Sequence, residues 1–320
     1  MVDACGLVVS RTPHTEESYR KTYLRLCRRC GADVSVDRIG LLEAVTAWWQ
    51  AHSGLWRPAT IRQYRAAILA EADALSLSSR WTPDHKAKYA NLSKESPLPR
   101  DRAAPRRTSA KKRRTVREKE IRKLATAAAG TKDRTGFMLA GILVYGASVG
   151  LRPCEWADAR IVDGTLAIRS AKTTNGRGIE SRFIEISILG AEKVARFSYF
   201  LNVLHEEIGT YGWSKIYRRL AKRLYRLCKK IGIPVISLYT VRHQALANAK
   251  RALDRVDVAA LAGHVSVRTA ATHYARRRNA WRPKPILRPT PEMRAAVRVT
   301  ATVARALRST SFSGFKAPRF

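Results

Sequence analysis

The stretch from Glu95 to Arg117 limits how the chain can fold, because it is rich in charge and proline and nearly free of large apolar residues. Such a segment buries too little apolar surface to offset its loss of conformational entropy, so we predict a basic linker. The linker separates a helical N-terminal domain (1–94) from a second domain (118–283). A C-terminal helix and tail (284–320) are expected to follow.

The balance of charge points to a polyanionic partner. Sixty-one Lys and Arg face 25 Asp and Glu in 320 residues, which gives a formal net charge of +36. So much positive charge repels the compact state unless a polyanion neutralises part of it, and nucleic acid is the leading candidate. A basic ribosomal or chromatin component is the alternative on composition alone. The residues predicted to contact a phosphate backbone are Arg62, Tyr64, Arg65, Lys111, Lys112, Arg113 and Arg114; a solvated helix face and an unstructured tether are the alternatives.

Membrane, secretory and metal-binding classes are not indicated. The first twenty residues do not resemble a signal peptide, and the longest apolar run, Gly136 to Leu151, falls short of the roughly 20 residues that span a membrane. We read that run as a buried helix and expect a cytoplasmic protein. Five cysteines, an odd number, predict reduced thiols. Cys27 and Cys30 form a CxxC without a second ligand pair, so no metal is predicted.

The apolar periodicity predicts a mainly α fold with one small antiparallel β-sheet (α+β). Helical spacing runs from about His14 to Leu77, with one helix starting near Thr60. In the second domain, Asn175-Gly176 predicts a hairpin. The other elements expected are helices at 116–129, 136–148, 190–208, 213–231, 240–253, 256–262 and 291–309, and strands at 166–169 and 183–188.

The segment Gly150-Leu-Arg-Pro-Cys-Glu places an arginine where a cation is unfavourable. Gly150 is suited to close one helix and Pro153 to open the next, so Arg152 is expected at a helix N-terminus. The helix dipole disfavours a cation there, whereas a phosphate bound by both Arg152 and the backbone N–H groups would explain it. An ion pair with Glu155 that braces the turn is the alternative.

Two further motifs follow in order. One is Leu238-Tyr-Thr-Val-Arg-His, and the other is Leu261-Ala-Gly-His with Tyr274 soon after it. A GLRxxE arginine, an xxxRH helix start, an LxGH turn and a later tyrosine together resemble the C-terminal catalytic domain of tyrosine recombinases, the phage integrase family. The resemblance spans about 116–278, and the N-terminal helices and linker look like that family's core-binding domain and connector.

The resemblance implies roles for individual residues. Arg152 and Arg242 would hold the scissile phosphate, which suits a guanidinium because it binds two oxygens at once. His264 would hydrogen-bond a nonbridging oxygen or the nucleophile's oxygen, the alternative being a cap on helix carbonyls. Lys172 would protonate the leaving 5′ oxygen, although it could be an ordinary exposed lysine or be confused with Arg169 or Arg177.

Tyr274 would be the nucleophile, attacking phosphorus to give a 3′-phosphotyrosine link, with no cofactor required. A buried core tyrosine is the alternative, but the neighbouring His273 and Arg276 make the setting polar and basic.

Two departures from the family pattern are visible. Tyr239 stands where the family usually has a histidine, and a phenol is a poor base at neutral pH. His273 lies at the commonest spacing for the nucleophile, one residue before Tyr274, and remains a minor alternative to it. Glu155 matches an acidic residue that would orient its neighbours.

The predicted function is therefore a site-specific DNA recombinase that integrates or excises a mobile element. The resemblance implies double-stranded DNA as partner, a homotetramer at synapsis and accessory DNA-bending proteins. The alternatives are a type IB topoisomerase or telomere resolvase, and a non-catalytic, sequence-specific DNA-binding protein of the same fold. A basic RNA-binding protein of unrelated fold would leave the ordered motifs unexplained.

Overall fold

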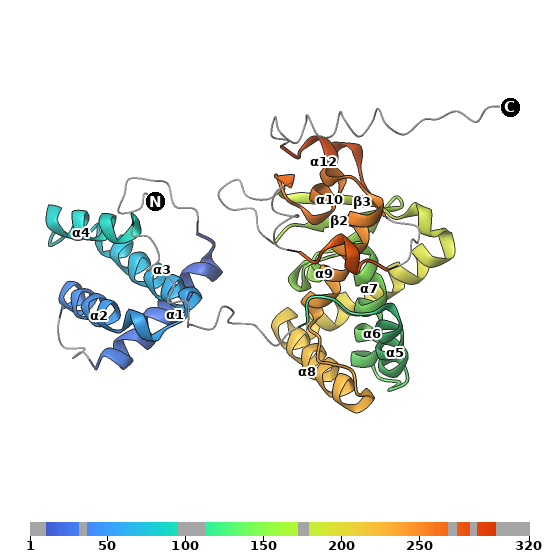
Figure 1. Cartoon of the computed structure of the whole chain (residues 1–320), viewed down its shortest axis with the longest axis horizontal. Helices are drawn as coiled ribbons and strands as arrows, with labels where there is room; N and C mark the ends of the chain where they lie inside the picture. The colour runs from blue at the N-terminus through green and yellow to red at the C-terminus, as the bar shows by residue number, and fades with distance from the viewer. Residues whose placement is uncertain are drawn as a thin grey trace. The chain divides into compact units, whose positions relative to one another are not determined.

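The computed structural model describes residues 11–31, 37–94, 113–171, 179–267, 274–281 and 287–298. The chain divides into two compact units, Met1–Ala110 and Lys111–Phe320, which Figure 1 colours along the sequence. Over the described residues it is mainly helical with one small antiparallel sheet, so the predicted fold class is confirmed.

Unit 1 is helical. Its elements are α1 (Pro13–Cys30), α2 (Arg38–His52), the 3₁₀ turn η1 (Ser53–Leu55), α3 (Pro58–Leu75) and α4 (Pro83–Lys94). The sequence analysis did not predict α4. Helix α3 begins at Pro58 rather than near Thr60, because a proline in the first turn gives up an N–H that has no intrahelical partner anyway. Large aromatic side chains fill the core, including Tyr23, Trp49, Tyr64 and Tyr89.

Unit 2 carries the longer helices. They are α5 (Glu118–Ala129), α6 (Arg134–Val149), α7 (Ala191–Tyr211), α8 (Trp213–Ile231), α9 (Leu238–Ala252), α10 (Arg255–Ala262) and α12 (Pro291–Ala295), with short 3₁₀ turns η2 (Pro153–Ala157), η4 (Ser187–Leu189) and η5 (Arg277–Asn279). Helix α6 packs against α5, α7, α8 and α9, and its buried face holds Leu139, Leu143 and Ala147. The apolar run is thus a buried helix, as predicted. No helix among the described residues is long and apolar enough to cross a membrane.

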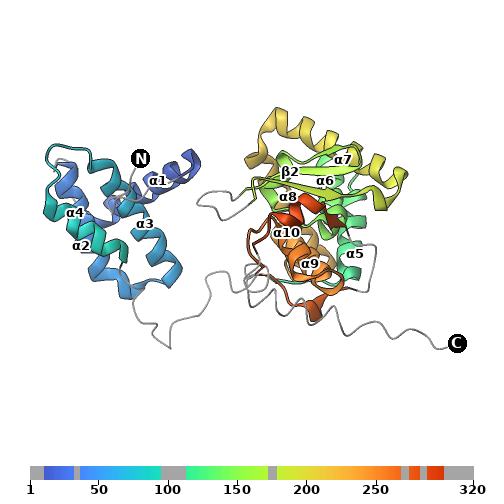
Figure 2. The same cartoon turned by 90° about the horizontal axis from the view of Figure 1, so that it is seen from above.

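The sheet lies beside the end of unit 2 that holds α10 (Figures 1 and 2). Its strands β1 (Arg160–Val162), β2 (Thr165–Arg169), β3 (Ser181–Glu185) and β4 (Arg288–Pro289) pair antiparallel in that order. The predicted strand at 183–188 is displaced, because the chain turns into η4 after Ile186. In the observed register Arg182 and Ile184 face the interior, whereas Phe183 points outward.

The last residues of the predicted linker belong to unit 2. Val116 is buried in its core, its N–H donates to Gln244 Oε1 at 3.2 Å, and its carbonyl accepts from Trp281 Nε1 at 2.9 Å. Arg113 donates twice to the carboxylate of Glu120, at 3.0 Å each. Val116 is a large apolar side chain in the stretch, and it anchors 113–117 by burial.

The C-terminal element is shorter than predicted. Helix α12 ends at Ala295, and Arg298 then bridges Ser266 instead of continuing the helix expected to run to 309. The backbone N–H of Arg298 donates to the carbonyl of Val265 at 2.8 Å, a contact that helical geometry would prevent. Residues 299–309 and the predicted Asn175-Gly176 hairpin lie outside the described residues.

Two helix-interior glycines differ in the space around them, which gives a test of the packing. A Cβ at Gly141 would come within 2.9 Å of Phe200 Cγ and closer to two other ring atoms. Among the described residues, and apart from the backbone of its own helix, nothing lies within 4 Å of a Cβ at Gly209. We expect Gly141→Ala to lower the free energy of unfolding by about 1–3 kcal/mol through overpacking. Gly209→Ala should raise it by up to about 1 kcal/mol through helix propensity. Denaturant unfolding of both variants checks this, and equal effects would contradict the α6–α7 packing.

Candidate active site

Arg242 lies at the centre of the site, on the second turn of α9. Its Nη1 donates to the carbonyl of Gly150 at 2.6 Å, and its Nη2 donates to the carbonyl of Ala262 at 2.8 Å. These carbonyls belong to the C-terminal ends of α6 and α10, where Gly150 and Gly263 adopt the left-handed conformation. Such carbonyls lack intrahelical partners and carry the negative end of the helix dipole, so a guanidinium stabilises both.

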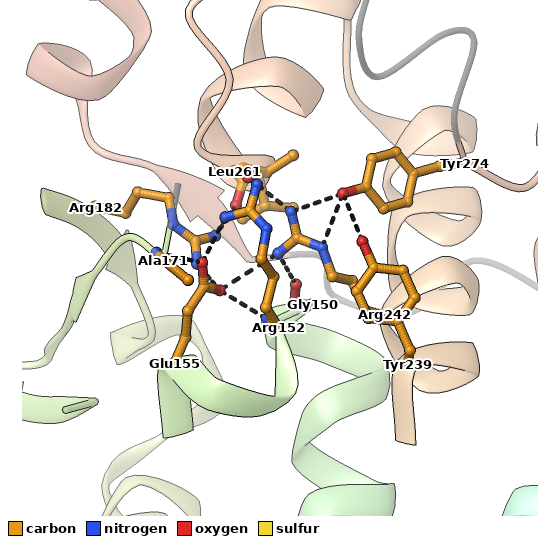
Figure 3. A network of polar contacts seen from close by, with 10 residues as sticks. Gly150, Arg152, Glu155, Ala171, Arg182, Tyr239, Arg242, Leu261 and Tyr274 are labelled. Atoms are coloured by element: carbon orange, nitrogen blue, oxygen red, sulfur yellow. Dashed lines mark hydrogen bonds and ion pairs between the residues drawn. The ribbon is translucent and has the colours of Figure 1, made fainter. Parts of the chain in front are cut away.

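The remaining edge of Arg242 holds Tyr274. The Tyr274 hydroxyl accepts from Nε at 3.2 Å and from Nη2 at 3.1 Å, and it lies 3.3 Å from the Tyr239 hydroxyl (Figure 3). Tyr274 is 7% exposed. The structure therefore brings together three residues that the sequence motifs had singled out.

Glu155 gathers three arginines. Its Oε1 accepts from Arg152 Nη1 at 2.5 Å and from the Ala171 N–H at 3.2 Å. Its Oε2 accepts from the Arg152 N–H at 2.6 Å, from Arg182 Nη2, and from Arg242 Nη1 at 3.5 Å. Burial alone would raise the pKa of Glu155, but the charges of Arg182, Arg242 and Arg152 lower it to about 2. The carboxylate is thus ionised at neutral pH.

The cluster retains an excess of positive charge, since three guanidinium groups surround one carboxylate. Arg152 lies at the N-terminus of η2 as expected, and it makes the ion pair with Glu155 that was the alternative to phosphate binding. Within the described part of the chain, no hydrogen bond engages its Nε or Nη2. That edge suits a bidentate anion such as a phosphodiester.

His264 follows the turn at Gly263 and is 4% exposed. Its backbone N–H caps α10 by donating to the Ala259 carbonyl at 2.9 Å, whereas its ring Nδ1 is buried without a partner among the described residues. Burial, reinforced by the charges of Arg242 and Arg152, lowers the pKa of His264 to about 3. The imidazole is therefore neutral at pH 7 and keeps both a donor and an acceptor nitrogen.

The pKa values of the Tyr274 and Tyr239 hydroxyls shift in opposite directions. Burial raises the pKa of Tyr274, but the charge of Arg242 and the hydrogen bonds from Tyr239 and Arg242 outweigh it, so the net shift is downward. Burial and the hydrogen bond to Tyr274 raise the pKa of Tyr239 to about 12. Tyr274 is accordingly the more acidic of the pair.

Several predicted residues lie outside the described residues. They are Lys172, His273, Lys111 and Lys112. Arg114 is exposed, and Arg113 is engaged by Glu120 as described above.

In unit 1, the prediction that Tyr64 faces a phosphate backbone is wrong. Tyr64 is buried, its ring meets that of Trp56 edge to face, and its hydroxyl accepts from Arg29 Nη1 at 3.0 Å. It shares the inward face of α3 with Ile68, one turn later, so helical periodicity explains the difference. Arg62 is exposed and Arg65 partly so, and both remain predicted DNA contacts.

Sequence reasoning missed Arg182 and His243. Arg182 is fully buried on β3 and binds Glu155, but its position was hidden because the strand was expected to begin one residue later. His243 lies with its ring centroid 5.1 Å from that of Tyr239 and 5.2 Å from that of Tyr274. Its place beside Arg242 in the xxxRH motif was the available signal.

No family model and no curated protein matches the chain. Solved structures do. A crystal structure of XerA recombinase matches at 16% identity, covering 97% of this chain and 94% of that one, with a TM-score of 0.33. A lambda integrase dimer bound to a COC′ core site matches at 14%, covering 87% and 94%, with a TM-score of 0.49. A lambda integrase tetramer bound to a Holliday junction matches at 15%, covering 86% and 75%, with a TM-score of 0.49. The likeness concerns the fold alone.

The burial of Glu155 predicts a pH-dependent stability. Because its pKa is about 2 when folded and 4.5 ordinarily, the stabilisation is complete above about pH 4.5 and is lost as the pH falls to about 2. We expect Glu155→Gln to lower the free energy of unfolding by about 3 kcal/mol at pH 7, with the deficit vanishing near pH 2. Denaturant unfolding across this range measures it. Glu192→Gln, which breaks an exposed pair with Arg196, should cost under about 1 kcal/mol; equal costs would contradict the buried cluster.

Proposed function

We propose that the chain is a site-specific DNA recombinase that cleaves and rejoins DNA through a 3′-phosphotyrosine intermediate. The observation that carries the proposal is the Tyr274 hydroxyl, held by two N–H groups of Arg242 near a neutral His264 and near the Arg152 edge that makes no hydrogen bond among the described residues. A buried phenol with a lowered pKa next to excess guanidinium charge is suited to attack a phosphodiester.

In this mechanism Arg152 and Arg242 bind the nonbridging oxygens of the scissile phosphate and stabilise the charge that develops in the transition state. Tyr274 oxygen forms a bond to phosphorus while the bond from phosphorus to the 5′ oxygen breaks. The phenolic proton passes to the acceptor nitrogen of the neutral His264 as the bond forms, and the departing 5′ oxygen takes a proton from Lys172. His264, being neutral, is able to donate to a phosphate oxygen or to accept from the phenol.

Reversal of the same step with a different 5′-hydroxyl exchanges strands, because the phosphotyrosine bond keeps the energy of the phosphodiester. The lambda integrase structures, a dimer on a core site and a tetramer on a Holliday junction, suggest the assembly in which this chain would act. We propose double-stranded DNA as partner, a homotetramer at synapsis, integration or excision of a mobile element as the role, and accessory DNA-bending proteins as helpers.

The test is covalent capture without a known site. A library of nicked duplexes, with sequences from the flanks of the encoding element and randomised cores, is incubated with wild type, Tyr274→Phe and His273→Ala, then denatured. We expect a denaturant-resistant adduct with wild type and His273→Ala, and none with Tyr274→Phe, since Arg242 holds the Tyr274 hydroxyl. Loss with His273→Ala alone would reassign the nucleophile. Site-specific binding without any adduct would favour the non-catalytic alternative.

A second expectation concerns α8, whose sequence contains no acidic residue. Its exposed cations lie on one side of the helix and include Lys215, Arg219, Lys222, Arg226 and Lys230. Such a row is able to follow a phosphate backbone, with each neutralised phosphate adding roughly −0.9 to the slope of log affinity against log salt.

We therefore expect the double substitution Lys222→Glu with Arg226→Glu to weaken DNA binding and to make the salt slope shallower by about 2. These positions are one turn apart and exposed, so the fold should tolerate the change. Titration of a labelled duplex at several salt concentrations provides the measurement. Lys193→Glu with Arg196→Glu on α7 is the matched control; the same loss in both would show a general charge effect rather than contact by α8.

A further inference from the structure

Arg182 is a buried arginine that does not reach the open side of the site. It is fully buried on β3, where its Nη1 donates to the Leu261 carbonyl at 2.7 Å and its Nη2 donates to Glu155. Its Nε is buried without a partner among the described residues. With its donors directed at the protein, Arg182 acts on neighbouring residues rather than on a bound phosphate.

The contacts of Arg182 connect two parts of the site. Glu155 fixes the η2 turn that carries Arg152, and Leu261 lies three residues before His264 at the end of α10. Figure 3 shows Arg182 reaching Glu155 and Leu261 from the side opposite Tyr274. A guanidinium has the planar fork needed to bond both acceptors at once, which a lysine lacks.

Gly263 makes room for this arrangement. A Cβ there would lie 2.8 Å from Nε of Arg182 and nearer still to its Cδ. Its φ of 69° also favours glycine. Gly232 ends α8 with nearly the same φ, 70°, yet a Cβ there meets nothing within 4 Å. Gly232 is thus explained by backbone conformation alone, whereas Gly263 is explained by both its backbone conformation and the nearby Arg182 side chain.

Neutralisation of Glu155 does not account for Arg182, because Arg152 and Arg242 already bond that carboxylate. A third guanidinium adds buried positive charge, which costs free energy. We propose that Arg182 is a positioning residue that fixes the His264 turn relative to Arg152, so that both converge on one phosphate. The proposal rests on the proposed function for its catalytic consequence.

The test compares four single variants in the full chain: Arg182→Met, Arg182→Lys, Gly263→Ala and Gly232→Ala. On a duplex recovered by covalent capture, we expect Arg182→Met and Gly263→Ala to slow single-turnover adduct formation by about 100-fold, the effect of misplacing a group by about 1 Å. DNA affinity should change less than about twofold, because most binding comes from phosphates elsewhere. Gly232→Ala should keep the wild-type rate. Arg182→Lys, which supplies a positive charge but not the planar guanidinium, should recover only part of the wild-type rate of adduct formation.

A wild-type rate in folded Arg182→Met would overturn the proposal, and so would equal losses in Gly263→Ala and Gly232→Ala, since backbone strain would then explain them. Thermal unfolding of each variant shows whether it is folded. If Arg182→Met is unfolded, the rates of Arg182→Lys and Gly263→Ala test the proposal instead, and wild-type rates in both would overturn it.

A second measurement needs no DNA and separates this inference from the proposed function. In protein labelled with ¹⁵N-histidine, we expect the ring resonances of His264 to move in Arg182→Met and Gly263→Ala and to stay in place in Gly232→Ala. If wild type forms no adduct but these shifts appear, the proposed function fails while the positioning role stands. Unchanged His264 resonances in Arg182→Met would overturn the positioning role.

Discussion

The buried carboxylate of Glu155 is the interaction on which the site depends. Taking a charge out of water costs several kcal/mol, and only close partners with good geometry offset that cost. Here the partners arrive from three directions: Arg152 from the same turn, Arg182 from the sheet and Arg242 from α9. One side chain therefore fixes the mutual arrangement of segments that are far apart in the sequence. Because three guanidinium groups surround one carboxylate, the cluster has an excess of positive charge. This charge favours the binding of a further anion, such as a phosphodiester.

The C-terminal ends of α6 and α10 also help to position the arginines of the cluster. Arg242 donates to the last carbonyls of α6 and α10, and Arg182 donates to a carbonyl in the same final turn of α10. The two guanidinium groups take the place of capping by water, so the helix ends can be buried. The glycines that end these helices, Gly150 and Gly263, bring the chain back toward the cluster in the left-handed conformation. The same hydrogen bonds therefore satisfy the backbone carbonyls at the helix ends and hold the two guanidinium groups in place.

The sequence alone predicted those features of the fold that depend on the local preference of one residue type. The left-handed end of α6 at Gly150, the position of Arg152 before Pro153 and the buried run of α6 follow from such signals. Tertiary signals were not available. Tyr64 lies between two arginines in the sequence, and only the inward face of α3 shows that it is buried. Arg182 lies just before the predicted strand at 183–188, whereas the structure places it within β3, opposite Ile168. The buried face of a strand depends on which elements pack against it, and the sequence alone does not give that packing.

The geometry of Arg242 constrains how a phosphate could enter. Its Nε and Nη2 form the edge that binds two oxygens of an anion, and that edge is occupied by the hydroxyl of Tyr274. In a displacement at phosphorus the nucleophile approaches along the axis of the leaving oxygen, whereas the arginines hold the oxygens around that axis. Under the proposed function, a phosphate that binds this edge of Arg242 therefore requires the Tyr274 hydroxyl to give up both donors and to take the axial position. In the structure the hydroxyl of Tyr274 satisfies this edge of the guanidinium, so Arg242 has no unpaired buried edge there.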